Sequence, residues 1–327
     1  MSEPLRFAVI GRNFVAEDFL AAAALRDDVR LHAVYSRSED AARAFALKHG
    51  AARTYTDLAL LAADPDVVFV YIASPNICHE PQTLSLLRGG KHVLVEKPAA
   101  TDAAAFRRMC DYADAEGLVL MEAMMSVHMP ALRQGKAWLS RLGTIRGGTI
   151  GFCQYSSRYD KFKRGIVENA FDPTLGNGAL MDIGVYCVEM MTCLVGAPRS
   201  VRCESVFLPG SIDGCGVIRA SYPDALWTLT YSKIDNGLLP CEVRGESGLL
   251  QFDRASRPRS VTLCLRDGTR ETFETPPGLP DMAYELEDFL SLVRGEADAL
   301  PYRRVTETTL AVMDKARADA GIDFQAH

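Results

Sequence analysis

The chain has 327 residues, of which 48% are hydrophobic and 24% are charged, and its formal net charge is −6. This balance is typical of a globular protein with two domains and excludes a disordered chain. The acidic charge and the lack of a basic run argue against nucleic acid as a partner. The sequence has no run of about 18 apolar residues of the kind that predicts a membrane span. The amino terminus goes directly into a predicted strand, without a basic or apolar leader segment. We therefore expect a cytoplasmic protein that acts on small molecules.

Nine cysteines are scattered through the chain without a C-x-x-C pair. Several of them, such as Cys153, Cys187 and Cys264, lie in apparent core segments. This distribution predicts buried, reduced thiols rather than disulfides or a zinc site, and we expect no metal.

Residues 1–124 alternate apolar strands with helix-spaced apolar residues. Strands are predicted at Leu5–Gly11, Leu31–Tyr35, Val67–Ala73, a run ending at Glu96, and Leu118–Glu122. Helices are predicted at Phe14–Leu25, Glu39–His49, Asp57–Ala63, a segment ending near Arg88, and Asp102–Glu116, with Thr101 as the N-cap of the last. These strands with their intervening helices predict a doubly wound parallel sheet.

The segment Tyr71–Thr101 forms a strand, helix and strand around two polar turns. Because crossovers between parallel strands are right-handed, Ser74-Pro75-Asn76 and Glu96-Lys97-Pro98 emerge at the same carboxyl edge of the sheet. Ligands of open α/β sheets bind at that edge. Lys97, held between an acid and a proline, is therefore a candidate functional residue.

The first strand-to-helix turn, Gly11 to Ala16, matches the dinucleotide fingerprint G-x-G-x-x-G/A except at Asn13. Asparagine tolerates a left-handed backbone, so the turn can still form. The pattern fits a cofactor site at Gly11, Asn13, Phe14 and Val15, and it equally fits a plain strand-to-helix connection.

The second strand ends in Ser36 and Arg37, where an NAD site usually has an acid. A hydroxyl and a guanidinium could hold a 2′-phosphate through charge-assisted hydrogen bonds. The alternative is that Ser38 caps the next helix while Arg37 is solvated, and both can hold together.

Residues 125–327 read as a second domain of long strand-like runs. Strands are predicted at Ile145–Tyr155, Ser200–Phe207, Gly216–Tyr222, Leu226–Ile234, Glu242–Phe252 and Val261–Leu265, and helices at Pro130–Leu139, Gly178–Leu194, Met282–Arg294 and Val305–Ala320. Turn signals at Asp213-Gly214 and Asp267-Gly268 favour a mostly antiparallel, open sheet.

The helix at Gly178–Leu194 carries Asp182 and Tyr186, four residues apart and so on one face. An acid inside an apolar helix needs a partner, and Lys97 is a candidate. Alternatively, Asp182 caps or pairs locally and Tyr186 is a core aromatic.

The order of these motifs resembles the Gfo/Idh/MocA oxidoreductase family. The segments concerned are S-P-N-x-x-H at Ser74–His79, E-K-P at Glu96–Pro98 and G-A-L-M-D-I-G-V-Y at Gly178–Tyr186. The resemblance implies a Rossmann domain and an open-faced α/β domain, with a nicotinamide cofactor between them. It also implies cofactor contacts from Ser74, Asn76, His79, Glu96 and Lys97, and oligomerisation through the open sheet, as a homodimer or dimer of dimers.

By the same resemblance, Lys97 is the catalytic lysine and Asp182 the helix aspartate of the family. Tyr186, where many members have histidine, is similar to the dihydrodiol dehydrogenase and glucose-fructose oxidoreductase branch, whose substrates are sugars or cyclic diols. Tyr155, Arg158 and Tyr159 are candidate substrate residues, with a solvated loop as the alternative.

We therefore expect reversible hydride transfer between the nicotinamide and a secondary alcohol or ketone of a sugar, cyclitol or vicinal diol, with NADP preferred over NAD. Either Tyr186 or Lys97 takes the hydroxyl proton, and Asp182 orients the lysine or the substrate. Two other classes remain open. The chain could be a dinucleotide-binding sensor or interaction protein without turnover, or a lyase or hydrolase that uses its cofactor transiently.

Overall fold

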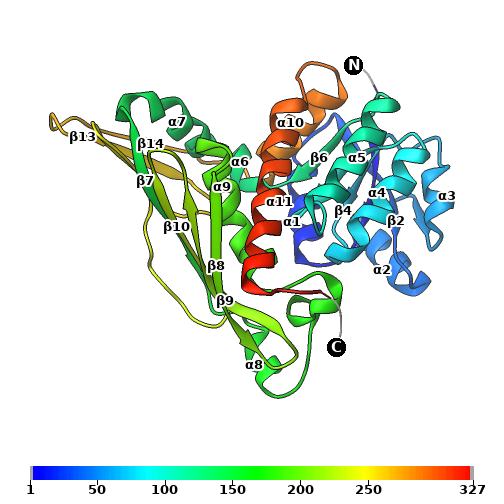
Figure 1. The fold of residues 1–327 in the computed structure, drawn as a ribbon. Helices are drawn as coiled ribbons and strands as arrows, with labels where there is room; N and C mark the ends of the chain where they lie inside the picture. The colour runs from blue at the N-terminus through cyan, green and yellow to red at the C-terminus, as the bar shows by residue number, and fades with distance from the viewer. Residues whose placement is uncertain (1–2, 325–327) are drawn as a thin grey trace. The chain divides into compact units, whose positions relative to one another are not determined.

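The computed structural model describes residues 3–324, which form two compact units (Figure 1). Of the described residues, the first unit contains 3–123 together with Gly278–Arg304, and the second contains Met124–Pro277 and 305–324. The sequence predicted a second domain at residues 125–327, with a C-terminal helix that could pack back on the first domain. The division differs because α10 (Met282–Val293) packs on α1 (Phe14–Ala23) within the first unit.

The first unit is built on a six-stranded parallel sheet with strand order β3-β2-β1-β4-β5-β6, which confirms the predicted doubly wound fold. The strands are β1 (Leu5–Ile10), β2 (Val29–Tyr35), β3 (Arg53–Tyr55), β4 (Phe69–Ile72), β5 (His92–Glu96) and β6 (Leu120–Ala123). Besides α1 and α10, its helices are α2 (Glu39–His49), α3 (Leu58–Ala62), the 3₁₀ turn Asn76–Cys78, α4 (His79–Arg88) and α5 (Ala103–Ala115). The strand order reverses between β1 and β4, which is where open α/β sheets bind ligands.

Local capping explains where two of these helices begin. Ser38 caps α2 as predicted, because its hydroxyl accepts a hydrogen bond from the amide of Ala41. The prediction that Thr101 caps α5 was wrong. Asp102 is the cap, and its Oδ1 accepts from the amide of Ala105 at 2.8 Å. A carboxylate at this position also interacts favourably with the helix dipole.

A layer of aromatic side chains forms part of the core of the first unit. The rings of Phe7 and Phe69 stack with centroids 5.1 Å apart, and those of Phe19 and Tyr71 stack at 3.8 Å. Phe289 of α10 packs edge-on against Phe69 at 5.2 Å. These contacts hold β1, β4, α1 and α10 together, so the edge where β1 and β4 end is rigidly supported.

The second unit is built on an eight-stranded sheet with strand order β14-β13-β12-β11-β7-β10-β9-β8. The strands are β7 (Ile145–Cys153), β8 (Ser200–Leu208), β9 (Ile212–Ser221), β10 (Leu226–Ser232), β11 (Cys241–Gly245), β12 (Gly248–Phe252), β13 (Ser260–Leu265) and β14 (Arg270–Glu274). Neighbouring strands are antiparallel except for β7 and β10, which confirms the mostly antiparallel prediction.

The helices of this unit include the π-helix Leu180–Gly184 and the α-helix that follows it. They are α6 (Met125–His128), α7 (Pro130–Trp138), α8 (Tyr159–Lys163), α9 (Val185–Val195) and α11 (Leu300–Ala320, which enters the unit at Val305), with 3₁₀ turns at Leu139–Leu142, Asn169–Phe171 and Pro173–Leu175. The predicted helix Gly178–Leu194 is therefore two helices, since a π-turn precedes α9.

One strand prediction and one turn prediction in this unit were wrong. The run Glu242–Phe252 is two antiparallel strands, β11 and β12, because the chain reverses at Glu246-Ser247. Asp213-Gly214 is not a turn but lies inside β9, where Asp213 is buried. The turn predicted at Asp267-Gly268 is present between β13 and β14.

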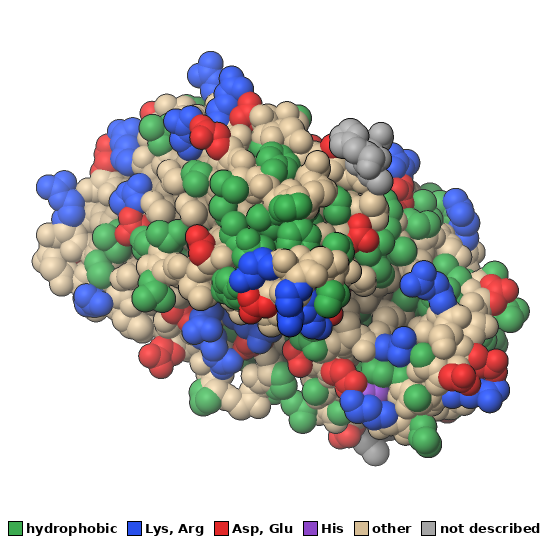
Figure 2. Space-filling model, turned by 90° about the horizontal axis from the view of Figure 1, so that it is seen from below, with side chains coloured by type: hydrophobic (Ala, Val, Ile, Leu, Met, Phe, Trp, Pro, Cys, Tyr) green, Lys and Arg blue, Asp and Glu red, His purple; other side chains and the backbone are tan. Residues whose placement is uncertain are grey.

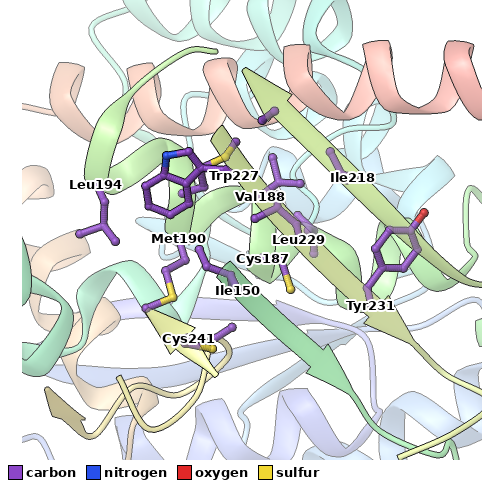
Figure 3. Packing of buried hydrophobic residues seen from close by; sticks show 14 of the residues in the cluster. Ile150, Cys187, Val188, Met190, Leu194, Ile218, Trp227, Leu229, Tyr231 and Cys241 are labelled. Atoms are coloured by element: carbon purple, nitrogen blue, oxygen red, sulfur yellow. The ribbon is translucent and has the colours of Figure 1, made fainter. Parts of the chain in front are cut away.

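Figure 3 shows the core of the second unit, where α9 packs on the inner face of the sheet. Trp227, Leu229 and Tyr231 alternate along β10 and point to this side, and Val188 and Met190 of α9 lie among them. The period of two places every second residue of β10 toward the helix layer.

The segment Pro173–Val195 is long and apolar enough to cross a membrane by length and composition, and 78% of its most apolar window is buried in the structure. Most of the segment belongs to the π-helix and α9, so burial in the core accounts for its hydrophobicity. All nine cysteines are free, but only Cys187, Cys203 and Cys241 are buried, so the prediction that Cys153 and Cys264 are buried was wrong. On the face drawn in Figure 2, acidic and basic side chains are intermixed.

Candidate active site

The glycine turn after β1 fits closely against the end of β4. Gly11 has φ +106°, and a Cβ added there would lie 2.3 Å from the carbonyl oxygen of Ala73. Any other residue would therefore push the two strands apart. This close approach leaves the carboxyl ends of β1 and β4 directly beside each other.

The expectation of a left-handed backbone at Asn13 was wrong, since its φ is −82° and its ψ is 176°. Instead, Asn13 is the N-cap of α1. Its Oδ1 accepts from the amide of Ala16 at 3.0 Å, and its Nδ2 donates to the carbonyl of Ala73 at 3.1 Å. Both ends of the amide are engaged within the fold, while Phe14, the first helical residue, is 60% exposed and Val15 is half-buried.

The end of β2 carries an exposed arginine beside a hydroxyl. Ser36 is held by β3, because its amide donates to the carbonyl of Tyr55, and its hydroxyl accepts from the amide of Ser38. Arg37 is exposed and forms no ion pair within residues 3–324. This confirms the capping role of Ser38 and leaves the guanidinium of Arg37 available in this unit.

A second arginine, Arg12, was missed by sequence reasoning. Ile10 of β1 is paired with Tyr35 of β2. Arg12 lies two residues after Ile10, and Arg37 lies two residues after Tyr35, so both arginines follow the same edge of the sheet. Arg12 is also exposed and makes no ion pair with any residue that the structure describes. The signal was available, because parallel register brings equivalent positions of neighbouring strands to one edge.

The segment after β4 is fixed by side-chain hydrogen bonds. Ser74 donates its hydroxyl proton to Oε1 of Gln82 at 2.7 Å, and Asn76 is buried at the start of the 3₁₀ turn. His79 is fully buried. Its ring nitrogens lie 2.9 Å from the carbonyl oxygens of Pro98 and Ser74.

Burial lowers the pKa of His79, the nearby Lys97 cation lowers it further, and the two carbonyls oppose that shift. A neutral imidazole has one N–H, and donation from Nδ1 to the carbonyl of Pro98 joins the loops that follow β4 and β5. His79 thus helps to fix the loops after β4 and β5 at the carboxyl edge of the parallel sheet.

Glu96 and Lys97 occupy the end of β5. Glu96 is buried, and its Oε1 accepts a 2.5 Å hydrogen bond from the hydroxyl of Tyr71. Burial raises the pKa of Glu96, while Tyr71 and the charge of Lys97 oppose the rise. The amide of Lys97 donates to Oε2 of Glu96 at 3.2 Å, and the amide of Ala99 donates to Glu122 at 2.7 Å. These bonds fix the backbone on both sides of Lys97, whose side chain is half-buried.

In the second unit, Asp182 lies in the π-helix that precedes α9. Its Oδ2 forms an ion pair with Nζ of Lys233 at 2.8 Å. Asp182 therefore has a cation partner within its own unit, as the local-pairing alternative held. Sequence reasoning did not name Lys233, although it continues the inward alternation of Trp227, Leu229 and Tyr231.

The start of this helix is held by a second buried acid. Oδ2 of Asp213 accepts from the amide of Leu180 at 2.6 Å. Gly178 has φ +148°, and a Cβ there would lie 1.9 Å from Oδ1 of Asp213. Burial raises the pKa of Asp213 to about 6, against the opposing effects of the Leu180 amide and the Lys233 cation. The sequence predicted a turn at Asp213 because an aspartate followed by a glycine, here Gly214, is a common turn signal.

Tyr186 lies in the first turn of α9 and is half-buried. Its ring packs edge-on against Phe152 of β7, with centroids 5.7 Å apart. Asp182 and Tyr186 are thus brought onto neighbouring turns, and the π-turn between them is a feature often found at functional sites.

The candidate substrate residues lie at the start of α8 and in the irregular segment just before it. Tyr159 stacks on Phe162 and Phe171, while Tyr155 donates to Asp160 at 2.7 Å. Arg158 pairs with Glu168 at 3.6 Å. All three predicted residues therefore have partners within the segment between β7 and the π-helix.

The two units match two family descriptions. Residues 5–124 match the oxidoreductase family with an NAD-binding Rossmann fold, and residues 139–251 match the GFO/IDH/MocA C-terminal domain. Among related proteins, scyllo-inositol 2-dehydrogenase (NADP(+)) IolU of Bacillus subtilis is 42% identical over 98% of this chain and 99% of its own. Trans-1,2-dihydrobenzene-1,2-diol dehydrogenase of Mus musculus is 28% identical over 98% of both chains.

A solved structure has the same fold over nearly the whole chain. KijD10, a 3-ketoreductase from Actinomadura kijaniata in complex with NADP and TDP-benzene, superposes with a TM-score of 0.85, at 25% identity over 97% of this chain and 98% of its own. Together these matches identify an NAD(P)-dependent oxidoreductase. The chain belongs to the Gfo/Idh/MocA oxidoreductase family.

Proposed function

We propose that this enzyme is an NADP-preferring dehydrogenase of a cyclic compound with neighbouring hydroxyl groups. The observation that carries the cofactor preference is the pair of exposed arginines, Arg12 and Arg37, at register-matched ends of β1 and β2. Two guanidiniums there offer charge-assisted hydrogen bonds to a 2′-phosphate, and Ser36 adds a hydroxyl. The relative IolU is named as NADP(+)-dependent, which supports this choice.

The first unit fits a dinucleotide on structural grounds. Gly11 gives the backbone close passage beside β4, and α1 begins at the same edge, where amide groups favour an anion. Asn13 turns its amide into the fold rather than over this edge. A pyrophosphate at Gly11, Asn13, Phe14 and Val15 is consistent with these features.

The substrate proposal follows from the chemistry of the relatives. One acts on an inositol and the other on a cyclic 1,2-diol, as their names state. Both are rings that carry adjacent hydroxyl groups. We therefore assign this chain a ring with vicinal hydroxyls, either a cyclitol or a pyranose sugar, with Tyr155, Arg158 and Tyr159 as candidate contacts.

The proposed mechanism uses Lys97, Asp182 and Tyr186. A bound nicotinamide supplies the hydride acceptor or donor at its C4 atom. During oxidation, Tyr186 or Lys97 takes the proton of the reacting hydroxyl, and the ammonium of Lys97 stabilises the developing alkoxide. Asp182 orients a substrate hydroxyl. Glu96, His79 and their hydrogen bonds hold the backbone of Lys97 in place.

A substrate screen tests this function. Inositols, pyranose sugars and cyclic vicinal diols are offered with NADP and with NAD, and the absorbance of the reduced nicotinamide is followed. We expect turnover of at least one ring polyol, faster with NADP. Tight NADPH binding without turnover of any compound would favour a sensor, and substrate loss without net reduction would favour a lyase or hydrolase.

We further propose that the chain forms a homodimer, or a dimer of dimers, and works in the cytoplasm. The exposed face of the strands β8, β9 and β10 supports the homodimer, because the apolar side chains of Val217 and Leu226 are exposed on it among charged side chains such as Arg219. The nine free thiols support a cytoplasmic location, since reducing compartments keep cysteines unpaired. Cell fractionation with an activity assay tests the location.

A further inference from the structure

Lys233 is a buried cation, and the pairing of its backbone in the sheet determines which way its side chain points. Its side chain is 2% exposed. Its amide donates to the carbonyl of Gly214 at 2.9 Å, and its carbonyl accepts from the amide of Ser156 at 2.8 Å. Strand pairing therefore continues through Lys233, and the alternation of β10 turns the side chain toward the π-helix.

Three partners compensate for the burial of this charge. Nζ of Lys233 lies 2.8 Å from Oδ2 of Asp182 and donates to the carbonyl of Ala170 at 2.6 Å. It also lies 4.7 Å from the centroid of the Phe171 ring. Removing an ammonium from water costs several kcal/mol, so a buried lysine is retained only where such partners fix it.

The pair between Lys233 and Asp182 is asymmetric. Lys233 is enclosed by the fold, whereas the side chain of Asp182 is 31% exposed. The lysine therefore holds one carboxylate oxygen from inside the unit. Such a contact fixes the rotamer of Asp182 without placing Lys233 against the substrate.

The same ammonium also reaches the segment that carries the candidate substrate residues. Phe171, which lies under Lys233, stacks on Phe162 at 5.1 Å and on Tyr159 at 5.8 Å. Tyr159 in turn packs edge-on against Tyr155 at 5.5 Å. One atom of Lys233 is thus linked both to Asp182 and, through a continuous layer of rings, to Tyr155.

We propose that Lys233 is a positioning residue, which fixes the Asp182 carboxylate and anchors the aromatic segment 155–171 to it. The assignment of its effect on turnover rests on the proposed dehydrogenase function. A residue that acts through Asp182 affects the transition state more than cofactor binding. Loss of Lys233 should therefore lower kcat while the affinity for NADPH is kept.

The kinetic test compares Lys233→Met, Lys233→Arg, Asp182→Asn and the double variant Asp182→Asn/Lys233→Met, using a ring polyol that the unmodified chain oxidises. We expect Lys233→Met to lower kcat about 30-fold or more, with the Kd for NADPH within about threefold. The double variant should lie within about threefold of Asp182→Asn, because both changes act on one carboxylate. Lys233→Arg keeps the positive charge and should recover part of kcat.

Lys91 provides a matched control. It is 6% exposed, and its Nζ donates to the carbonyl of Asp64 at 2.5 Å in the first unit. Lys91→Met removes a buried cation away from Asp182 and should leave kcat unchanged. A kcat for Lys233→Met within threefold of the unmodified enzyme, a fully multiplicative loss in the double variant, or an equal loss in Lys91→Met would each overturn the proposal.

Hydrogen exchange gives a readout that does not depend on turnover. Lys233→Met should increase amide exchange in residues 155–171 and leave β8 and β9 unaffected. Unchanged exchange in that segment refutes the anchoring role. If the unmodified chain oxidises no polyol, the proposed function fails, and the exchange result alone then decides whether Lys233 anchors the segment.

Discussion

Arg12 and Arg37 differ from most arginines of the chain because they are exposed and form no ion pair within the described residues. If they hold a 2′-phosphate, Arg37→Ala should weaken NADPH binding by about 10- to 100-fold, as expected for one charge-assisted hydrogen-bonded contact. NADH lacks this phosphate, so its affinity should change less than about threefold.

Fluorescence titration with both cofactors measures these affinities. Arg43→Ala is the control, because Arg43 is exposed on α2 and pairs with Glu39. Equal losses for NADPH and NADH in Arg37→Ala, or tighter binding of NADH by the unmodified enzyme, would show that the preference lies elsewhere.

Asn13 replaces the second glycine of the fingerprint and has two structural duties, as cap of α1 and as donor to Ala73. Asn13→Ala should lower the free energy of unfolding by about 1 kcal/mol, because the cap is lost. Asn13→Gly should cost only a few tenths of a kcal/mol from the cap. Urea unfolding measures both, and an equal cost for the two would contradict the capping role.

Lys97 and Tyr186 are proposed to handle the proton of the substrate hydroxyl. Lys97→Met and Tyr186→Phe keep most of the side-chain volume, so their packing losses should be modest. Each should lower kcat by roughly a hundredfold or more while NADPH affinity is kept. The double change should cost less than the product of the two, since groups that act as a unit are not additive. Near-normal turnover in Lys97→Met would reject this assignment.

At the level of an element, Asp213 links stability to pH through the start of the π-helix. Its pKa rises from the ordinary 3.8 to about 6 on folding, chiefly through burial. The folded protein therefore binds this proton more tightly than the unfolded chain does. The free energy of unfolding thus loses up to about 3 kcal/mol as pH rises from about 4 to about 6, and the loss is complete above that window.

Asp213→Asn isolates this effect, because an amide oxygen can still accept from Leu180 but does not ionise. Relative to the unmodified protein, the variant should gain stability as the pH is raised from 4 to 7. Urea unfolding at several pH values measures the difference. The control is Glu204→Gln, since Glu204 is exposed. A difference that does not vary with pH would disprove the link.

Periodicity in the sequence predicted the elements more accurately than their junctions. Helix α2 has the predicted bounds, because Ser38 and Gly50 give explicit start and stop signals. β11 and β12 were merged because the turn signal of Gly245 and Gly248, which flank Glu246-Ser247, was overlooked. Local pattern also cannot tell that a dipeptide such as Asp213-Gly214 is paired on both sides in a sheet.

The candidate site was predicted where a motif marks the residue and missed where only tertiary placement does. Lys97, Asp182 and Tyr186 lie in segments that carry a resemblance. Lys233 has none, and its partner Ala170 is 63 residues away in sequence. Only the inward position of a charged residue on β10 signalled that it needed a buried partner.

At the scale of the whole molecule, we expect a scattering mass of at least twice 35.8 kDa at micromolar concentration. A charge placed on the exposed sheet face, as in Val217→Asp or Leu226→Asp, should shift the enzyme toward monomers, because it would have to be desolvated between copies. Leu47→Asp is the control, since Leu47 is 87% exposed on α2. A monomer mass for the unmodified chain would count against the proposal.

The first unit is discontinuous in sequence, since α10 joins it from residues 278–304. During synthesis, the partners of Phe289 therefore emerge from the ribosome long before Phe289 does. Until then, Phe69 and the face of α1 that packs on α10 lack part of their cover. A fragment cut at residue 124 would keep this exposure permanently and should be prone to aggregation. The nucleotide-binding half thus depends for its solubility on a segment translated near the end of the chain.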